Sequence, residues 1–440
     1  MRYTGFLALA FALAFGLVAA HGQTCSPPGT PTCDPNGNPV VPSPRPPSPT
    51  PDPGPTPNPT PDPSPAPDAP TSVETISAVT GTVTLGGGRA VAGAEGIALD
   101  PTTGLVYIGL NGAIISGCEG DGTTTPGPGA GQLSVVNPSQ AREIAAVRTG
   151  QAPIWPTVHP ARGLVYMMGS GGTGTINVHS ASDGTLIRTI TVGGRPHMGG
   201  LDLSTGLMVV GNTVRSSNTV AEQNHATIVN MTTNSIVREF ETSPAPHGMA
   251  VDQERHIGYF SAVGDGAIVA VNTETGQTLF SRVPKSAYGS AFGGNNMLAR
   301  QAATRRLFQV NTQMGFTGII VVDEVTLAAE KVISFGSTSP VPWGMWVDEP
   351  NRLLFAALPN SNAIGVVDLD SLTHVASIPV GTCPYAVTID PVRNIGVTSN
   401  QGSPRENATA SILNMCPVYR SLGRIAAGCS ALDVFKRRRF

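Results

Sequence analysis

The chain repeats one short pattern along most of its 440 residues, and this repeat limits the folds that it can adopt. Each copy is an apolar run that ends in an anchor residue and a turn, followed by a second apolar run, as in GIALDPTTGLVYIGL (96–110). The anchors lie 59, 43, 50, 96 and 42 residues apart, at Asp100, His159, Asp202, Asp252, Asp348 and Asp390. Because the interval of 96 residues spans two periods, a degenerate copy at 291–311 completes a set of seven.

A second motif, which reads as strand, turn and strand, follows each copy of the first. Its turn opens with Asn or Asp in six copies, and our alignment of the repeats places His179 at this position in the remaining one. Asn and Asp side chains accept a hydrogen bond from the backbone two residues further on, which starts a turn. We therefore expect His179 to be a turn residue, and we expect the anchor His159 to be exposed.

Two strands followed by a hairpin make a four-stranded antiparallel unit, which cannot cover its own apolar faces. Seven such units can do so by packing around an axis. Only 12% of the residues are charged, against roughly 25% in a typical domain, and 52 residues are glycine, which suits short strands and many turns. The sequence therefore predicts an all-β fold, a seven-bladed β-propeller over residues 73–428. Residues 73–88 read as the outer half of a unit, so we expect them to pair with the last blade and close the ring.

The two ends of the chain do not follow the repeat. Residues 1–20 read as a signal peptide, because the apolar run 6–20 is short for a membrane span and ends in small residues. Residues 21–72 are a cysteine-containing segment and a proline-rich linker, which we expect to be disordered, and residues 429–440 are a basic tail. We expect an exported protein, periplasmic, on the cell surface or extracellular, with no transmembrane segment after signal cleavage.

Six cysteines in an exported chain are disulfide candidates. They are Cys25, Cys33, Cys118, Cys383, Cys416 and Cys429. We expect Cys25 and Cys33, eight residues apart, to close a small loop, whereas spacing does not fix the pairing of the other four.

The repeat resembles the YVTN family of seven-bladed propellers. The segments that carry the resemblance include LVYIGLNG (105–112) and VVDLDSLTHVASIPVGTCPYAVTIDP (366–391). The resemblance implies a propeller that is exported or displayed on a cell surface, in a family whose members often have no known reaction. Related propellers include lactone hydrolases and the copper-cluster domain of nitrous oxide reductase. A propeller is a scaffold for many activities, so the resemblance says more about the fold than about the function.

The residue five positions before each anchor should lie where the chain enters the innermost strand of a blade, at the mouth of the central channel. Arg195 lies close to one of these positions, and Tyr288 is our assignment for the degenerate copy. The predicted channel-mouth residues are Glu95, Ile154, Arg195, His197, His247, Tyr288, Trp343 and Tyr385.

Three interpretations of this ring are open. The residues could line a water-filled mouth, bind a ligand such as a sugar, a peptide end or a small anion, or hold a transition metal through His197 and His247. We expect no cofactor unless that metal binds.

We favour a non-catalytic binding or display module whose partner is an unknown protein, glycan or small molecule. The alternative is an enzyme, a lactonase-like hydrolase or a metal-dependent activity that uses Glu95, His197 and His247. The net charge of −3 does not favour a nucleic-acid partner.

Overall fold

A computed structural model describes most of the chain from residue 73 to residue 429. The described residues are 73–89, 93–112, 131–150, 152–171, 173–212, 225–242, 245–263, 266–283, 297–311, 318–336, 341–403 and 406–429. All of them belong to one compact unit, which covers Ala69–Phe440. The predicted signal peptide and linker lie outside the described residues.

Seven sheets, each with four antiparallel strands, make up this unit, one for each repeat, and we number them as blades 1 to 7. The first three blades each follow the order of the chain. Blade 1 comprises β3 (Ala94–Leu99), β4 (Val106–Leu110), β5 (Gln132–Asn137) and β6 (Arg142–Arg148). Blade 2 comprises β7 (Pro153–His159), β8 (Leu164–Gly169), β9 (Thr175–Ser180) and β10 (Leu186–Thr191). Blade 3 comprises β11 (Pro196–Asp202), β12 (Leu207–Asn212), β13 (His225–Asn230) and β14 (Ser235–Glu241).

The next two blades have the same order. Blade 4 comprises β15 (Pro246–Asp252), β16 (Ile257–Ala262), β17 (Ile268–Asn272) and β18 (Thr278–Arg282). Blade 5 comprises β19 (Leu298–Gln301), β20 (Arg306–Asn311), β21 (Gly318–Asp323) and β22 (Ala329–Ile333). Short 3₁₀ helices form three of the turns in the molecule, at Pro138–Gln140, Pro160–Arg162 and Pro359–Ser361.

The last two blades each include a strand from the N-terminal segment of the propeller. Blade 6 comprises β23 (Met345–Asp348), β24 (Leu353–Leu358), β25 (Ala363–Asp368), β26 (Thr373–Pro379) and, as a fifth strand, β1 (Glu74–Thr75). Blade 7 comprises β27 (Pro384–Asp390), β28 (Ile395–Asn400), β29 (Thr409–Asn414) and β2 (Val79–Thr84). β1 pairs in parallel with β26, and β2 pairs antiparallel with β29. Since β1 and β2 are consecutive in the chain, one N-terminal segment joins the outer edges of both blades.

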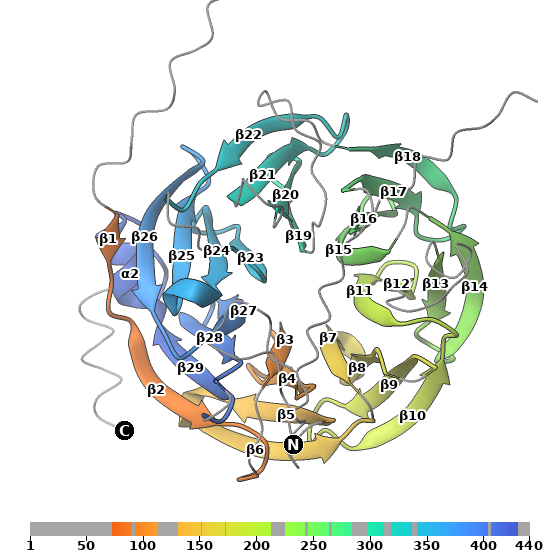
Figure 1. Cartoon of the computed structure of the whole chain (residues 1–440), viewed down its shortest axis with the longest axis horizontal. Coiled ribbons are helices and arrows are strands. Elements are labelled where there is room, and N and C mark those ends of the chain that lie inside the picture. Colours follow the sequence, from red (N-terminus) through yellow and green to blue (C-terminus); the bar gives the residue numbers. More distant parts are fainter. Residues whose placement is uncertain are drawn as a thin grey trace, which may run out of the picture. The chain divides into compact units, whose positions relative to one another are not determined.

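The blades close into a ring. Figure 1 shows β3, β7, β11, β15, β19, β23 and β27 as the innermost strands around one centre. Innermost strands of neighbouring blades contact one another, and β27 contacts β3, which joins the last blade to the first. The predicted seven-bladed β-propeller is confirmed.

The anchor residues act as turn formers after the innermost strands. The Asp390 carboxylate accepts hydrogen bonds from the backbone N–H groups of Val392 (3.0 Å) and Arg393 (2.9 Å), as the turn chemistry of aspartate predicts. In blade 5 the strand pairing places Gln301 opposite Arg306 at the anchor position, where its side chain accepts a hydrogen bond from Thr304. The degenerate copy therefore keeps the anchor but not the carboxylate.

Tyrosines on the second strands join neighbouring blades. The hydroxyl of Tyr166 in blade 2 donates to the Asn234 side chain of blade 3 at 2.8 Å, and Tyr259 in blade 4 donates to Glu324 of blade 5 at 3.1 Å. Each tyrosine buries its ring and uses its hydroxyl to satisfy a polar group across the gap between blades.

A short C-terminal helix, α2 (Met415–Ser421), covers the closing region. Cys416 on this helix forms a disulfide with Cys429, and both lie in the same apolar cluster as Ile76 and Ala78 of the N-terminal segment. Cys383 is also disulfide-bonded. The candidates Cys25, Cys33 and Cys118 lie outside the described residues, as does the tail after Cys429. Within the described part of the chain, no helix has the length and apolar character needed to cross a bilayer.

Two histidines differ from their predicted positions. Ser180, not His179, lies opposite Leu164 as Asn230 lies opposite Leu207, so the turn position in blade 2 belongs to Ser180. His179 is a strand residue with no exposed surface, and the prediction of a turn role was wrong by one position. His159 is only 7% exposed, because its ring is covered where β7 ends, so the prediction of an exposed side chain was also wrong.

Candidate functional site: the axial cavity and its mouth

A cavity of about 280 Å³ lies on the axis of the ring, and every blade contributes to its wall. Most of the lining side chains are apolar, and three of them are methionines, whose flexible thioethers adapt to ligands of different shape. The lining residues are Ile97, Trp155, Met198, Met249, Ala250, Leu298, Ala299, Arg300, Met345, Trp346, Val347 and Val387. The volume is about twice the roughly 150 Å³ of an apolar cavity that can hold benzene.

A β-bulge interrupts the innermost strand of five blades at the predicted mouth position. The register shifts fall at Glu95–Gly96, Ile154–Trp155, His197–Met198, His247–Gly248 and Tyr385. A bulge adds a residue to one strand and changes the direction of the side chains around it. The bulges therefore decide which side chains of these segments face the channel.

Three aromatic residues form an arc over one side of the mouth. The Tyr385 ring of blade 7 lies between Trp343 of blade 6, with centroids 5.3 Å apart, and Trp155 of blade 2, at 6.3 Å. Trp155 reaches Tyr385 across blade 1 because Gly96 has no side chain. A Cβ at Gly96 would lie 2.5 Å from the Trp155 ring.

Two histidines lie together on the blades that the aromatic arc does not use. His197 of blade 3 and His247 of blade 4 are both buried, and their ring centroids are 3.3 Å apart at an interplanar angle of 31°. Among the described residues, no group of three or more His, Cys, Asp or Glu could hold a metal.

The other predicted mouth residues occupy different surroundings. The Glu95 carboxylate accepts a hydrogen bond from Asn111 of the same blade, and its backbone carbonyl accepts one from Ser399 of blade 7. Ile154 is 6% exposed and precedes Trp155, which is the residue that lines the cavity. Arg195 is half-buried, and Tyr288 lies outside the described residues.

A network of charged residues lies at the anchor end of the cavity. Arg300, which lines the cavity, contacts Glu324 through Nε at 2.8 Å and Asp252 through Nη2 at 3.1 Å. Arg255 pairs with the same two carboxylates, both of which are buried. Burial acts to raise the pKa of Asp252, but the hydrogen bond from Arg255 and the charges of both arginines outweigh it, so this pKa lies below its usual value.

Sequence analysis missed three features of this site. Trp155 was passed over because the count from the anchor ended one residue earlier, at Ile154, and both residues lie in the bulge that follows Pro153. The methionines, which lie one or two positions after the mouth residues of their blades, read as ordinary core residues. Arg300 could have been found from the repeat, since it is the one charged residue directly before an anchor.

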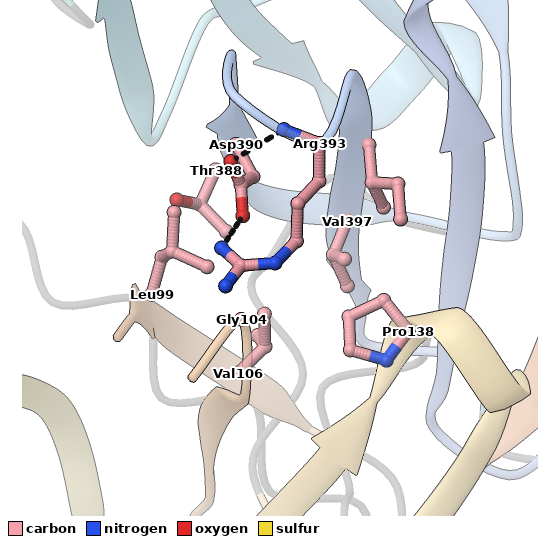
Figure 2. A pocket seen from close by; sticks show the side chains of 9 residues that line it. Leu99, Gly104, Val106, Pro138, Thr388, Asp390, Arg393 and Val397 are labelled. Atoms are coloured by element: carbon pink, nitrogen blue, oxygen red, sulfur yellow. Dashed lines mark hydrogen bonds and ion pairs between the residues drawn. The ribbon is translucent and has the colours of Figure 1, made fainter. Parts of the chain in front are cut away.

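A second, much smaller cavity lies between blades 7 and 1. Figure 2 shows Thr388, Asp390 and Arg393 beside it, with the Arg393 guanidinium bound to the Asp390 carboxylate. Its volume of about 10 Å³ is enough for one water molecule and excludes an organic ligand.

The fold and the axial cavity define a seven-bladed β-propeller with a small-molecule-sized pocket on its axis. Among solved structures, the chain is similar to hydrazine synthase of Kuenenia stuttgartiensis, with a TM-score of 0.59 and 12% identity over 73% of this chain and 95% of that one. At this identity the similarity shows the fold alone. No protein-family model and no curated protein matches the chain.

Proposed function

We propose that this protein is an exported, non-catalytic propeller of the YVTN type that binds a small, mainly apolar molecule in its axial cavity. The observation that carries the proposal is the cavity of about 280 Å³ with a wall built by all seven blades. An apolar pocket with few polar groups is the usual form of a small-molecule site. A glycan fits this lining poorly, because its hydroxyl groups would lose water without finding partners.

Two further observations support parts of this proposal. The Cys416–Cys429 disulfide is typical of an oxidising compartment, which supports export. The segment LVYIGLNG, on which the YVTN resemblance depends, forms the second strand of blade 1 and the turn after it.

Catalysis is the alternative, and the adjacent imidazoles of His197 and His247 are the observation in its favour. A lactonase-like or metal-dependent activity would also need Glu95, whose described contacts are to Asn111 and to blade 7. We place binding first because the histidine pair lies on blades 3 and 4, whereas Glu95 is on blade 1.

The test uses N-phenyl-1-naphthylamine, an uncharged dye whose fluorescence rises in apolar sites. All three tryptophans of the chain, Trp155, Trp343 and Trp346, lie at the mouth or in the cavity wall, so energy transfer from tryptophan to the dye reports binding near the axis. We expect saturable binding at one site per chain, with strong energy transfer.

The variant Ala250→Leu, which fills part of the cavity, should weaken dye binding at least about tenfold. Val392→Leu, at a position 81% exposed, is the matched control and should leave binding unchanged. Absence of saturable binding in the unaltered protein would overturn the proposal. Hydrolysis of a lactone, or stoichiometric metal lost in a His197→Ala/His247→Ala variant, would favour the alternative.

A further inference from the structure

The axial cavity contains one charged residue among the described residues that line it, Arg300. Its side chain is 16% exposed, while the Asp252 and Glu324 side chains that hold it are 2% and 0% exposed. Two arginines and two carboxylates form this network, so its charges balance. A ligand in the cavity therefore meets a fixed hydrogen-bond donor in surroundings with no net charge.

The donor capacity of Arg300 is not exhausted by the network. A guanidinium has five N–H donors, and those of Arg300 that are bound belong to Nε and Nη2. Nη1 makes no hydrogen bond within the described part of the chain. It can donate to an acceptor that enters the cavity without losing a contact to either carboxylate.

The balance of charge selects the kind of acceptor. A ligand carboxylate would lose its hydration beside a network whose two arginines are already paired with Asp252 and Glu324, so the network offers no net positive charge to compensate that loss. An uncharged carbonyl oxygen accepts the same hydrogen bond at a smaller cost of desolvation. The apolar lining accommodates the rest of such a molecule.

We infer that the axial cavity is specific for uncharged apolar molecules that carry a carbonyl group, that is, ketones, esters or amides, with the carbonyl oxygen bound by Arg300. This inference rests on the proposed function and deepens it. It makes Arg300 the residue that orients the ligand, while Met198, Met249 and Met345 adapt to its apolar part.

The experiment measures displacement of N-phenyl-1-naphthylamine by three compounds of similar size. They are acetophenone, which carries a carbonyl, ethylbenzene, which has no acceptor, and benzoate, which is charged. We expect acetophenone to bind at least about tenfold more tightly than benzoate. The replacement Arg300→Lys keeps the charge but offers no second terminal nitrogen. It should weaken the binding of acetophenone about tenfold, which is the effect of losing a hydrogen bond to a charged donor. The affinity for ethylbenzene should change by less than about twofold.

The matched control is Arg306→Lys in the same blade. The Arg306 guanidinium pairs with Glu330 at 2.7 Å, and Arg306 does not line the cavity. It should leave all three compounds unchanged. The inference would be overturned if Arg300→Lys lost equal affinity for acetophenone and ethylbenzene, or if benzoate bound most tightly to the unaltered protein. The proposed binding function would stand in either case. Failure of the dye itself to bind would instead refute the proposed function. If Arg300→Lys does not fold, the order of acetophenone and benzoate on the unaltered protein still decides.

Discussion

At the scale of single residues, the molecule depends on a few side chains that the repeat does not specify. His179 is one of them, because the equivalent strand position in the neighbouring blade is Val229. Its Nδ1 lies 2.7 Å from the Gly184 carbonyl and its Nε2 lies 2.6 Å from the Thr149 hydroxyl. A carbonyl can only accept, so Nδ1 carries a hydrogen and donates it to Gly184. In the neutral buried ring, Nε2 then accepts the hydrogen of the Thr149 hydroxyl.

This burial predicts a pH-dependent stability. Burial lowers the pKa of His179 below its ordinary value of about 6.5. The unfolded chain then binds more protons than the folded one, so stability is complete above about pH 6.5 and falls as the pH decreases toward the folded-state pKa. The loss is up to about 1.4 kcal/mol per pH unit. His179→Val should remove this part of the slope in urea unfolding measured between pH 7 and pH 5.

The control for this experiment is Leu186→Val, at the position paired with His179 across the hairpin. It changes the packing without changing titration, so its effect should be the same at every pH. An unchanged slope in His179→Val would mean that this ring does not contribute to the acid sensitivity.

Gly96, the first residue of the repeat copy at 96–110, affects the shape of the mouth. A Cβ there would lie 2.5 Å from the Trp155 ring and 2.7 Å from the backbone carbonyl oxygen of Ile154, which cannot move aside cheaply. We expect Gly96→Ala to cost about 1–3 kcal/mol of unfolding free energy, as overpacking usually does, and to change the near-ultraviolet circular dichroism of the aromatic arc.

The matched control for Gly96 is Gly258→Ala on β16. Its new Cβ would meet the flexible end of Met249 at 2.9 Å, which can shift. This variant should cost less than about 1 kcal/mol and leave the aromatic signal unchanged. Equal effects of the two variants would show that Trp155 is not held against Gly96.

At the scale of elements, the sequence predicts strands and turns well and the mouth poorly, for physical reasons. Anchors such as Asp390 form turns through local hydrogen bonds, so their spacing reads directly as strand ends. The bulge at Ile154–Trp155 places two residues of β7 opposite one residue of β8, so the alternation of side chains along the strand is interrupted there. The count back from the anchors therefore finds the segments at the mouth but cannot decide which of two adjacent side chains enters the channel.

The small cavity between blades 7 and 1 leads to a prediction about a buried water molecule. Thr388 on β27 is 2% exposed, and its hydroxyl has no partner among the described residues. It borders the cavity of about 10 Å³ together with Asp390 and Arg393 (Figure 2). A water molecule there would satisfy the hydroxyl and bridge it to the charged pair.

The sign of the change in unfolding free energy caused by one substitution tests whether this water is present. If water binds the hydroxyl, Thr388→Val should destabilise the protein by about 1 kcal/mol, whereas a dry hydroxyl replaced by a methyl group should stabilise it. Thr398→Val on the neighbouring strand is the control, because its hydroxyl donates to Asn400 at 2.8 Å and its loss should destabilise in either case. Both free energies come from the same urea titration.

At the scale of the whole molecule, the N-terminal segment closes the ring in more ways than the repeat indicates. The pairing of β2 with β29 follows from the half-unit at 73–88. The pairing of β1 with β26 does not follow from the repeat, because a strand of two residues, Glu74 and Thr75, is too short to show a recognisable pattern. It also pairs in parallel, unlike the strands of the repeat. Sequence periodicity thus predicts the number of blades, while the fifth strand of blade 6 depends on a path that only the assembled ring provides.

This closure predicts the effect of two truncations. Removal of residues 1–72 leaves β1 and β2 in place and should leave the thermal unfolding of the propeller unchanged. Removal of residues 1–85 also takes away Val83 and Leu85, which are 5% and 0% exposed, and each contributes about 1.5–3 kcal/mol by burial. It also leaves the outer edge of β29 without its partner strand. We expect the longer truncation to lose at least about 5 kcal/mol of unfolding free energy and to bind N-phenyl-1-naphthylamine weakly, because the axial cavity needs all seven blades in place.

A synthetic peptide of residues 73–88 should then restore both properties when it is added to the longer truncation. An extended peptide can add to an exposed sheet edge through main-chain hydrogen bonds, and the apolar side chains at Val83 and Leu85 fix its register. A peptide of the same composition in scrambled order is the control and should have no effect. If the longer truncation is as stable as the shorter one, the ring is held closed by contacts between β27 and β3 instead, and the N-terminal strand is an accessory to a closure already complete.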